Sequence, residues 1–560
     1  MSYQLKIFCK NLNRYIDING GETLLDILAD IGPELGFEPV VANVNNRTED
    51  LSFPVFSPKH VEFLGAGTSA GRSAVVRSLC MMLYKAATDV VPGARLRFEH
   101  SISNGYYCCL HGAGLPEHGP EENTMEAIRT RMRQLAEENH EFIRKERLTA
   151  HAIDIFRKQG LDDKVMLLEG STELYTVYYR LDGICDTYLG PLVPSTGALR
   201  VFNLIKYEDG MLLLGPDPEN SAVPAKPVAQ PKLFNAFTDY LRFNKIVDVA
   251  DVAQLNKAVK DRQTARVINV AEAMHNKYMA LISDRIARIN ADGGARIVLI
   301  AGPSSSGKTT STKRLAIQLM TNLIVPKMIS LDDYFVDRDK TPLDADGDYD
   351  YENLHALDLE RLNTDLEALL KGKQINLPTY SFELGKRIER EKPLKLGPHD
   401  VLLMEGIHGL NPELVSGIDP DATFKMYVSA LTTLNIDDHN WISTTDNRLL
   451  RRIVRDHKYR HTSALETIRR WPSVRRGETK WIFPFQENAD AMFNSSLIFE
   501  LGVMKDYVMP LLRDVPRNMP EYAKAVELMR LLDTFDSIPA DLLPSTSVLR
   551  EFLGGSSFHY

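Results

Sequence analysis

Cysteine is scarce in this chain, and its spacing excludes the roles that clustered cysteines take. Five cysteines occur among 560 residues, and no two of them form a C-x-x-C pair. Zinc ribbons and disulfide frameworks both need closely spaced or evenly paired cysteines, so we expect neither. This usage is typical of a protein in a reducing, cytoplasmic compartment.

Long apolar runs and an excess of basic residues are also absent. The sequence contains no apolar stretch long enough for a membrane span, and its first residues lack the basic and apolar segments of an export signal. We therefore expect no export signal and no membrane association. A formal net charge of -9 argues against a general nucleic-acid binder. Hydrophobic residues make up 44% of the chain and charged residues 25%, which is typical of a soluble globular protein.

Changes of pattern along the chain predict five parts. Residues 1–66 alternate strand-like runs around one helix-like segment (23–31), which predicts a small β-grasp module. Residues 67–220 predict an α+β region, with helices over 73–87 and 123–147. Residues 221–292 form a linker and a helical connector, since five prolines fall within 216–232. Residues 293–510 predict an α/β domain with a doubly wound parallel sheet, and residues 511–560 predict a C-terminal helix and tail.

The most specific motif is Gly302-Pro-Ser-Ser-Ser-Gly-Lys-Thr309, which matches the phosphate-binding pattern G-x-x-x-x-G-K-[ST]. A strand-like run precedes it and a helical pattern follows it, as this loop requires. Small residues allow backbone N–H groups to face a polyphosphate, and the helix N-terminus adds positive charge. We expect Lys308 to contact the β- and γ-phosphates of ATP and the Thr309 hydroxyl to bind Mg²⁺. The full predicted nucleotide set is Gly302, Ser304, Ser305, Ser306, Gly307, Lys308, Thr309 and Thr310.

Two carboxylates follow predicted strands. The run 327–331 leads into Asp332, which we expect near the γ-phosphate, because strand C-termini of an open α/β sheet face the ligand. There it can accept a proton from an attacking hydroxyl or hold metal-bound water. The run 401–404 ends in Glu405, which is placed to support Mg²⁺. The alternatives are a turn or cap carboxylate at Asp332 and a plain strand-ending acid at Glu405.

A predicted helix over 446–460 gathers its arginines on one face. At 100° per residue, Arg448, Arg451, Arg452 and Arg455 lie together, whereas Leu449, Leu450, Ile453 and Val454 lie opposite. Guanidinium groups match the oxygens of a transferred phosphoryl group, so this helix is predicted to be a closing lid. A solvated basic face or an RNA contact would produce the same pattern.

Six stretches in order resemble the uridine kinase and phosphoribulokinase family: residues 301–310, 330–335, 348–352, 377–382, 400–407 and 446–456. The resemblance implies that Asp332 is the general base and that Arg448, Arg452 and Arg455 are lid arginines. It implies that Asp350 contacts sugar hydroxyls and that Tyr380 and Phe382 contact the base. Tyr334, beside Asp332, belongs to the same predicted substrate site. Gly385 departs from the family, because uridine kinases carry a base-reading histidine there.

The front of the chain resembles the TGS and editing modules of threonyl-tRNA synthetase, through residues 44–50, 103–107 and 186–194. The editing domain's metal ligands align with Arg77, Met81, Tyr188 and Leu192, none of which is a metal ligand of that type. Editing hydrolysis is therefore not expected, whereas a binding or regulatory module, with a contact to RNA or tRNA, is consistent with the resemblance.

Together these features predict an ATP- and Mg²⁺-dependent kinase that phosphorylates a small-molecule alcohol, foremost the 5′-hydroxyl of a nucleoside such as uridine or cytidine. One alternative is a kinase for a sugar phosphate or a pantothenate-like alcohol, which Gly385 leaves open. The other is an RNA-linked regulator whose nucleotide site acts as a switch. The sequence leaves the oligomeric state open.

Overall fold

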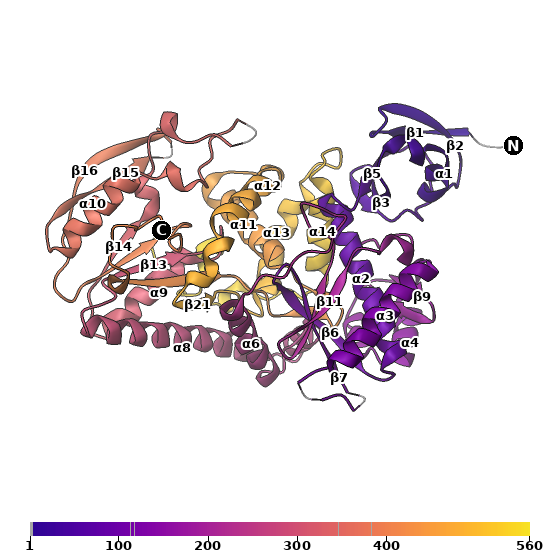
Figure 1. Cartoon of the computed structure of the whole chain (residues 1–560), viewed down its shortest axis with the longest axis horizontal. Helices are drawn as coiled ribbons and strands as arrows, with labels where there is room; N and C mark the ends of the chain where they lie inside the picture. The colour runs from indigo at the N-terminus through magenta and orange to yellow at the C-terminus, as the bar shows by residue number, and fades with distance from the viewer. Residues whose placement is uncertain (1–3, 113, 117, 345–346, 382, 560) are drawn as a thin grey trace.

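A computed structural model describes residues 4–112, 114–116, 118–344, 347–381 and 383–559. Figure 1 shows three sheet-containing regions in succession, with the N-terminal sheet at one end and the long helix α8 (Thr264–Ala291) along the base of the C-terminal region. No helix in the described ranges combines the length and apolarity that crossing a bilayer requires.

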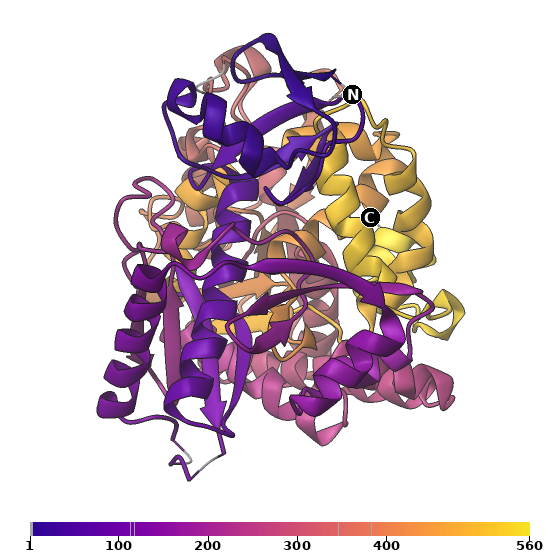
Figure 2. The same ribbon diagram turned by 90° about the vertical axis from the view of Figure 1, so that its right-hand side faces the viewer.

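The N-terminal region (residues 4–65) is the predicted β-grasp module. Its five-stranded sheet has the order β2-β1-β5-β3-β4, in which only β1 and β5 pair in parallel. Helix α1 begins where Thr23 and Asp26 form a capping box. Figure 2 shows this module standing on the next region. The bounds are β1 Gln4–Cys9, β2 Arg14–Asn19, α1 Leu24–Leu35, β3 Pro39–Val44, β4 Arg47–Glu49 and β5 His60–Gly65.

The middle region (residues 69–214) is the predicted α+β part, with two antiparallel sheets and four helices. One expectation was wrong: the helix predicted over 123–147 ends at Glu138, because Asn139 adopts a left-handed conformation (φ 55°) and β8 then pairs with β9. The bounds are α2 Ser69–Val90, β6 Arg95–Ile102, β7 Gly105–His111, α3 Glu122–Glu138, β8 Ile143–Leu148, α4 Thr149–Lys158, α5 Asp162–Glu169, β9 Tyr175–Leu181, β10 Ile184–Asp186, β11 Asn203–Tyr207 and β12 Gly210–Leu214.

Helices α6 (Pro231–Ile246), α7 (Val252–Lys260) and α8 form the predicted helical connector. The sequence predicts an apolar stripe through Val267, Val270, Met274, Leu281 and Ile282, which is wrong in part, since Val270 and Leu281 are exposed. The buried face of α8 instead runs through Ile268, which packs among the C-terminal helices, and through His275 and Met279, which pack on the C-terminal sheet. Its polar members, among them Glu272 and His275, hid this face from a purely apolar pattern.

The C-terminal region (residues 297–559) contains a parallel five-stranded sheet of order β14-β17-β13-β18-β21. The strands are β13 Ile297–Ala301, β14 Pro326–Ser330, β17 Val401–Glu405, β18 Thr423–Ser429 and β21 Ala491–Asn494. Central strand β13 is buried throughout: Ile297 and Leu299 enter one core, and Val298 and Ile300 enter the core on the other face. The chain leaves β13 for one side of the sheet and later returns to the other, which places a topological switch point at its C-terminal end.

Helices α9 (Lys308–Thr321) and α8 cover one face of this sheet, and α10 (Leu359–Leu370) covers the other, so the sheet is doubly wound. Figure 1 shows the chain end returning to this sheet. The remaining bounds are β15 Ile375–Ser381, β16 Lys386–Leu394, β19 Asn435–Asp437, β20 Asn440–Trp441, α11 Thr444–Arg460, α12 Ala464–Trp481, α13 Glu500–Arg513, α14 Tyr522–Asp533 and α15 Arg550–Leu553.

The β19–β20 hairpin fastens the C-terminal region to the middle region. Lys164 of the middle region donates to Asp437 at 2.7 Å and pairs with Asp186 at 2.9 Å, all three side chains being buried. Asn435 donates to the Phe98 carbonyl at 2.6 Å. Because removing one partner of a buried ionic network is costly, these contacts hold the two regions together.

Candidate active site

The phosphate-binding loop follows β13 at the switch point, as its motif requires. Gly302 has no room for a side chain, since an added Cβ would lie 1.9 Å from the Val428 carbonyl oxygen. Ser305 (φ 59°) and Gly307 (φ 79°) take left-handed conformations, and α9 then begins at Lys308. The loop therefore turns sharply and presents its N–H groups beside the N-terminus of a helix, the arrangement that binds anions.

Three donors hold the loop by its outward-facing carbonyl groups. Arg448 donates to the Ser304 carbonyl at 3.1 Å, Arg451 to the Ser305 carbonyl at 3.5 Å, and the Ser495 hydroxyl to the Ser306 carbonyl at 2.5 Å. Because an N–H group points away from the C=O group of the same peptide unit, anchoring the Ser304 and Ser306 carbonyls outside the loop turns the Ser305 and Gly307 N–H groups inward, whereas the Ser306 N–H bonds to the Pro303 carbonyl at 3.2 Å.

Arg448 and Arg451 thus differ from the mobile lid arginines that the sequence predicted. Arg448 is only 1% exposed and forms a two-bonded pair with Glu478, one bond measuring 2.8 Å. Arg451 is fully buried and pairs with Glu500 at 2.5 Å. Both side chains hold the loop in the structure, whereas the sequence predicted a lid role for Arg448.

The side chains of Lys308, Thr309 and Glu405 come together at the C-terminal edge of the sheet. The Thr309 hydroxyl donates to Glu405 at 2.9 Å, and the Lys308 ammonium donates to the Pro303 carbonyl at 3.1 Å. Burial lowers the pKa of Lys308, although Glu405, Glu551, Asp332 and Glu352 oppose this. The ammonium group therefore lies in the field of four carboxylates.

The Lys308 ammonium group alone does not balance the negative charge of these carboxylates. Burial raises the pKa of Glu405 to about 7, and neighbouring Asp332 and Glu551 add to the shift. Burial also raises the pKa of Glu352 to about 7, with Glu478 contributing. Asp332, at the end of β14, has a raised pKa because of desolvation, which Lys308 partly offsets. An added cation would stabilise all three ionised forms.

Mg²⁺ fits this demand. It prefers one or two protein oxygens and takes its remaining ligands from phosphates and water, so the Thr309 hydroxyl and the Glu405 carboxylate are suitable holders. In the described part of the chain, no group of three or more His, Cys, Asp or Glu side chains forms a metal site by itself.

The raised pKa of Glu405 predicts a pH dependence for Mg²⁺–ATP binding. Only the ionised carboxylate serves Mg²⁺, so affinity is expected to fall by up to about tenfold per pH unit below pH 7. Without metal, the folded state holds protons that the unfolded state releases between the ordinary glutamate pKa and about 7. The free energy of unfolding should therefore decrease as pH rises through that window.

Titration calorimetry of Mg²⁺–ATP binding between pH 6 and pH 8 measures this effect as a falling affinity with proton release. Glu405→Gln is the matched variant and should flatten the profile. An affinity of the wild-type protein that stays constant below pH 7 would contradict the account.

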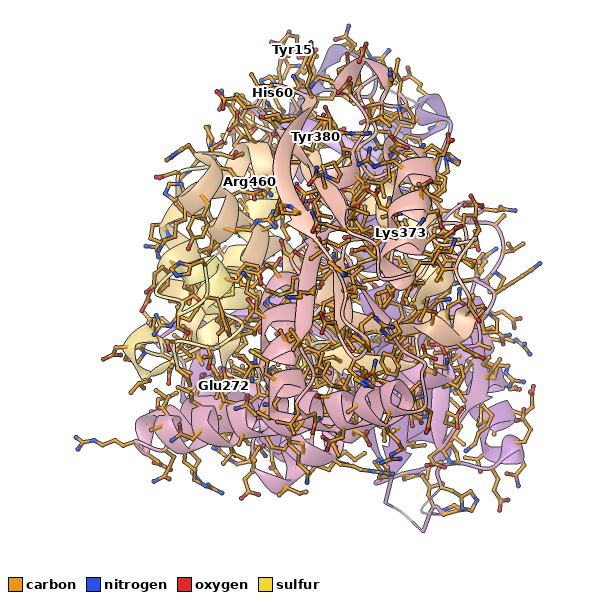
Figure 3. The ribbon with its side chains drawn as sticks, turned by 90° about the vertical axis from the view of Figure 1, so that its left-hand side faces the viewer. Tyr15, His60, Glu272, Lys373, Tyr380 and Arg460 are labelled. Atoms are coloured by element: carbon orange, nitrogen blue, oxygen red, sulfur yellow. The ribbon has the colours of Figure 1, made fainter. Side chains whose placement is uncertain are left out.

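The other predicted arginines lie nearer the open side of the site. Arg452 donates to the Ser304 hydroxyl at 2.9 Å and to Asp456 at 3.2 Å, while Arg455 donates to Asp456 at 2.8 Å. Arg460, which the sequence did not single out, acts electrostatically on Asp332. Figure 3 shows Arg460 and Tyr380 toward the same end of the molecule, opposite Glu272 on α8. All three guanidinium groups pair with Asp456 and keep part of their surface exposed.

The predicted substrate residues occupy different environments in the structure. Tyr334 is a core residue: it is fully buried and donates to Asp365 at 3.2 Å. Asp350 accepts from the Glu352 backbone N–H at 3.2 Å, so its role in the structure is that of a turn residue. Tyr380 lies on β15, with its ring centroid 5.5 Å from that of Phe335. Phe382 lies outside the described residues.

Gly385 borders an arginine. Gly385 has a φ of 64°, and an added Cβ would lie 2.6 Å from the guanidinium carbon of Arg338. Arg338 in turn donates to the Tyr351 hydroxyl at 3.1 Å. A cation therefore takes up the space next to position 385, at which the sequence departs from the uridine kinase pattern.

The C-terminal tail reaches the nucleotide loop, which the sequence did not predict. Glu551 of α15 accepts from the Thr310 backbone N–H at 3.1 Å and from the Thr310 hydroxyl at 2.6 Å. Val548 packs on Gly307, where an added Cβ would lie 2.4 Å from a Val548 methyl group. The tail thus places a carboxylate on donors at the N-terminus of α9.

Comparison with known sequences agrees with this geometry. Residues 297–497 match the model of the "Phosphoribulokinase / Uridine kinase family". Over these residues the chain is similar to that family. The match supports a small-molecule kinase, and the matched range includes the loop Gly302–Thr309.

Relatives match different parts of this chain. A uridine kinase from Halobacterium salinarum is 30% identical over 158 residues, which cover 28% of this chain and 60% of that protein. A threonine–tRNA ligase from Rubrobacter xylanophilus is 28% identical over 189 residues, 34% of this chain and 29% of that enzyme, and matches the N-terminal region. The chain therefore spans less than two thirds of either relative. A solved structure of a possible uridine kinase from Bacillus stearothermophilus is 25% identical, covers 26% of this chain and 80% of its own, and has a TM-score of 0.21.

Proposed function

We propose that the kinase-family region (residues 297–497) transfers the γ-phosphoryl group of ATP to a hydroxyl of a small molecule, foremost the 5′-hydroxyl of a nucleoside. The observation that carries this is the bond from Thr309 to Glu405 beside Lys308, with Asp332 in the same electrostatic cluster. In the proposed reaction, Asp332 accepts the proton of the attacking hydroxyl.

The remaining residues would bind and orient. The loop N–H groups and Lys308 hold the phosphates, and Thr309 and Glu405 hold Mg²⁺, which offsets charge on the transferring group. Arg452, Arg455 and Arg460 contribute guanidinium groups on the open side, while Arg448 and Arg451 keep the loop in shape. This division follows from burial, because the last two are enclosed and the others are not.

The acceptor test uses purified full-length protein, Mg²⁺ and ATP with uridine, cytidine, adenosine and several phosphorylated or carboxylated alcohols. We expect ATP-dependent formation of a nucleoside monophosphate. A protein that binds ATP and Mg²⁺ but phosphorylates none of these acceptors would contradict the proposed function.

Arg338 favours a second candidate, a kinase for an anionic alcohol. Its guanidinium group lies beside position 385, where it would attract a phosphate or carboxylate on the acceptor. In the same panel, this candidate predicts that phosphorylated or carboxylated alcohols outcompete nucleosides. Arg338→Met should then raise KM for the anionic acceptor about tenfold or more without changing KM for ATP.

We expect Glu551 to lower the affinity for ATP by a measurable amount. Its carboxylate accepts from the Thr310 N–H and hydroxyl, donors that a phosphate oxygen would also use. Removing a negative charge at a helix N-terminus next to a polyphosphate should raise ATP affinity, by about threefold to tenfold. Glu551→Gln keeps the shape of the side chain, and fluorescence titration with a labelled ATP analogue measures the change. A weaker affinity in this variant would show that the tail supports the nucleotide instead.

A further inference from the structure

A cavity of about 390 Å³ lies where the middle region meets the C-terminal region. Its walls come from α2, β6, β7, the β19–β20 hairpin, the first turn of α11, and α14. Figure 1 shows α11, α14 and α2 at this junction. Lys308, Thr309, Glu405 and Asp332 do not line it, so it is distinct from the nucleotide site.

Arg77 of α2 supplies a cation to one wall. Its guanidinium group donates to the Pro191 carbonyl at 3.2 Å and 3.1 Å, and it forms no salt bridge within 4.0 Å to any residue described in the structure. Desolvation lowers its pKa, and the more distant Glu527 only partly offsets this. A guanidinium group with a carbonyl as its partner is a receptor for a carboxylate.

Asp446 and Glu527 supply negative charge at another wall. Asp446 pairs with Lys524 at 2.7 Å, and the same ammonium pairs with Glu527 at 3.2 Å. Two carboxylates therefore share one ammonium group. Burial raises the pKa of Asp446, so a further cation would stabilise its ionised form.

These four charges sum to zero, with two of each sign, which disfavours a nucleotide or another strongly anionic ligand. His439, also at the wall, is already bonded to Asp186 at 2.7 Å. The rings of Tyr106 and Trp441, whose centroids are 4.6 Å apart, provide an apolar surface. The remaining polar lining includes five hydroxyls: Ser69, Ser73, Ser101, Ser443 and Thr445.

We propose that this cavity binds a free α-amino acid, with its carboxylate at Arg77, its ammonium group at Asp446 and its side chain against Tyr106 and Trp441. A zwitterion places an anion beside Arg77 and a cation beside the two carboxylates that share Lys524, without changing the net charge of the cavity. This inference does not depend on which acceptor the kinase-family region uses.

Occupancy of the cavity should reach the nucleotide site through α11. The first turn of this helix carries Asp446, and Arg448 and Arg451 follow on the same helix and hold the loop carbonyls. A ligand that shifts the start of α11 therefore shifts the anchors of the loop. By linkage, amino acid and ATP must change each other's affinity by the same factor.

Binding of the twenty proteinogenic amino acids to the full chain tests the proposal by calorimetry and tryptophan fluorescence. We expect at least one to bind with a Kd below about 1 mM. Arg77→Met and Asp446→Asn should each weaken that binding about tenfold or more. Arg72→Met is the matched control on α2, because Arg72 bonds to the Gly67 and Pro218 carbonyls away from the cavity. The matching amine without a carboxylate and the matching carboxylate without an amine should not bind.

Melting curves of the unliganded variants show whether each is folded. If Arg77→Met does not fold, Arg77→Lys replaces it in the binding test. Arg77→Lys keeps the positive charge but loses the planar pair of N–H donors of the guanidinium group, so it should weaken binding as well. Three results would overturn the proposal: no amino acid bound at about 10 mM, binding unaffected by the folded Arg77 variant, or a nucleoside that displaces the amino acid. Each is read from binding alone, so failure of the kinase proposal would not affect it.

Discussion

Asp332→Asn is expected to lower kcat by about 10² to 10⁴ while leaving ATP affinity within about threefold of wild type. The carboxylate lies at the end of β14, in the field of Lys308, and desolvation raises its pKa. An amide of the same shape cannot accept the proton of the attacking hydroxyl. The substitution also leaves in place every N–H donor of the loop and of the helix that would bind phosphate.

The measurement is steady-state transfer from ATP to the best acceptor, together with equilibrium ATP binding to the same preparation. Asp333→Asn is the matched control, because Asp333 is the adjacent residue in the same turn, and kcat should remain within about threefold of wild type. If Asp332→Asn retains full kcat, Asp332 is a turn carboxylate and the nucleotide site works as a switch or uses another base.

Arg448→Met is expected to destabilise the protein by roughly 3 kcal/mol or more, since it leaves Glu478 buried without its main partner. Arg448 and Glu478 are almost entirely enclosed, and Arg448 also holds the Ser304 carbonyl. The loop should lose its shape, so ATP affinity should fall along with stability. Arg475, which donates to Glu478 at 2.8 Å, limits the loss.

Thermal and urea unfolding measure this effect. Arg469→Met is the control: it breaks an exposed arginine–carboxylate pair with Glu521 and should leave the melting temperature nearly unchanged. The double variant Arg448→Met, Glu478→Met removes both buried charges and should regain part of the stability without regaining ATP affinity. An unchanged melting temperature in Arg448→Met would show that the buried pair does not support the fold.

The parts of the site that follow from short-range pattern could be predicted. The loop motif, the strand before it and the helix after it depend on neighbouring residues, and each has its predicted place. Asp332 and Glu405 were placed by the same logic, because parallel strands end at one edge of the sheet. Glu405 is bonded to Thr309, 96 residues away in the chain.

The parts that depend on long-range packing could not be predicted. Glu478 and Glu551 contact the loop from 174 and 241 residues away, and no motif marks either residue. A helical wheel showed that Arg448 and Arg451 share a face of α11 but not that this face is buried under the loop. The pattern around 139–148 was misread because charged residues suit an exposed strand as well as a helix, and a single left-handed residue, Asn139, ended the helix.

The hairpin β19–β20 illustrates the same limit. Nothing in its sequence predicts burial, whereas in the structure its charged residues are buried against the middle region. A buried charged residue can be predicted from sequence only when its partner is known. Here the partner, Lys164, lies 273 residues away in the chain. The connection between the two halves of the chain therefore emerges only from the structure.

Transfer of a labelled γ-phosphate from ATP is the most direct test of the central claim, that Lys308, Thr309, Glu405 and Asp332 form a phosphoryl-transfer site. The account predicts a labelled phosphomonoester with wild-type protein and Mg²⁺, its loss when Mg²⁺ is chelated, and its loss in Asp332→Asn despite intact ATP binding. Labelled product formed equally well by Asp332→Asn, or formed without Mg²⁺, would contradict it.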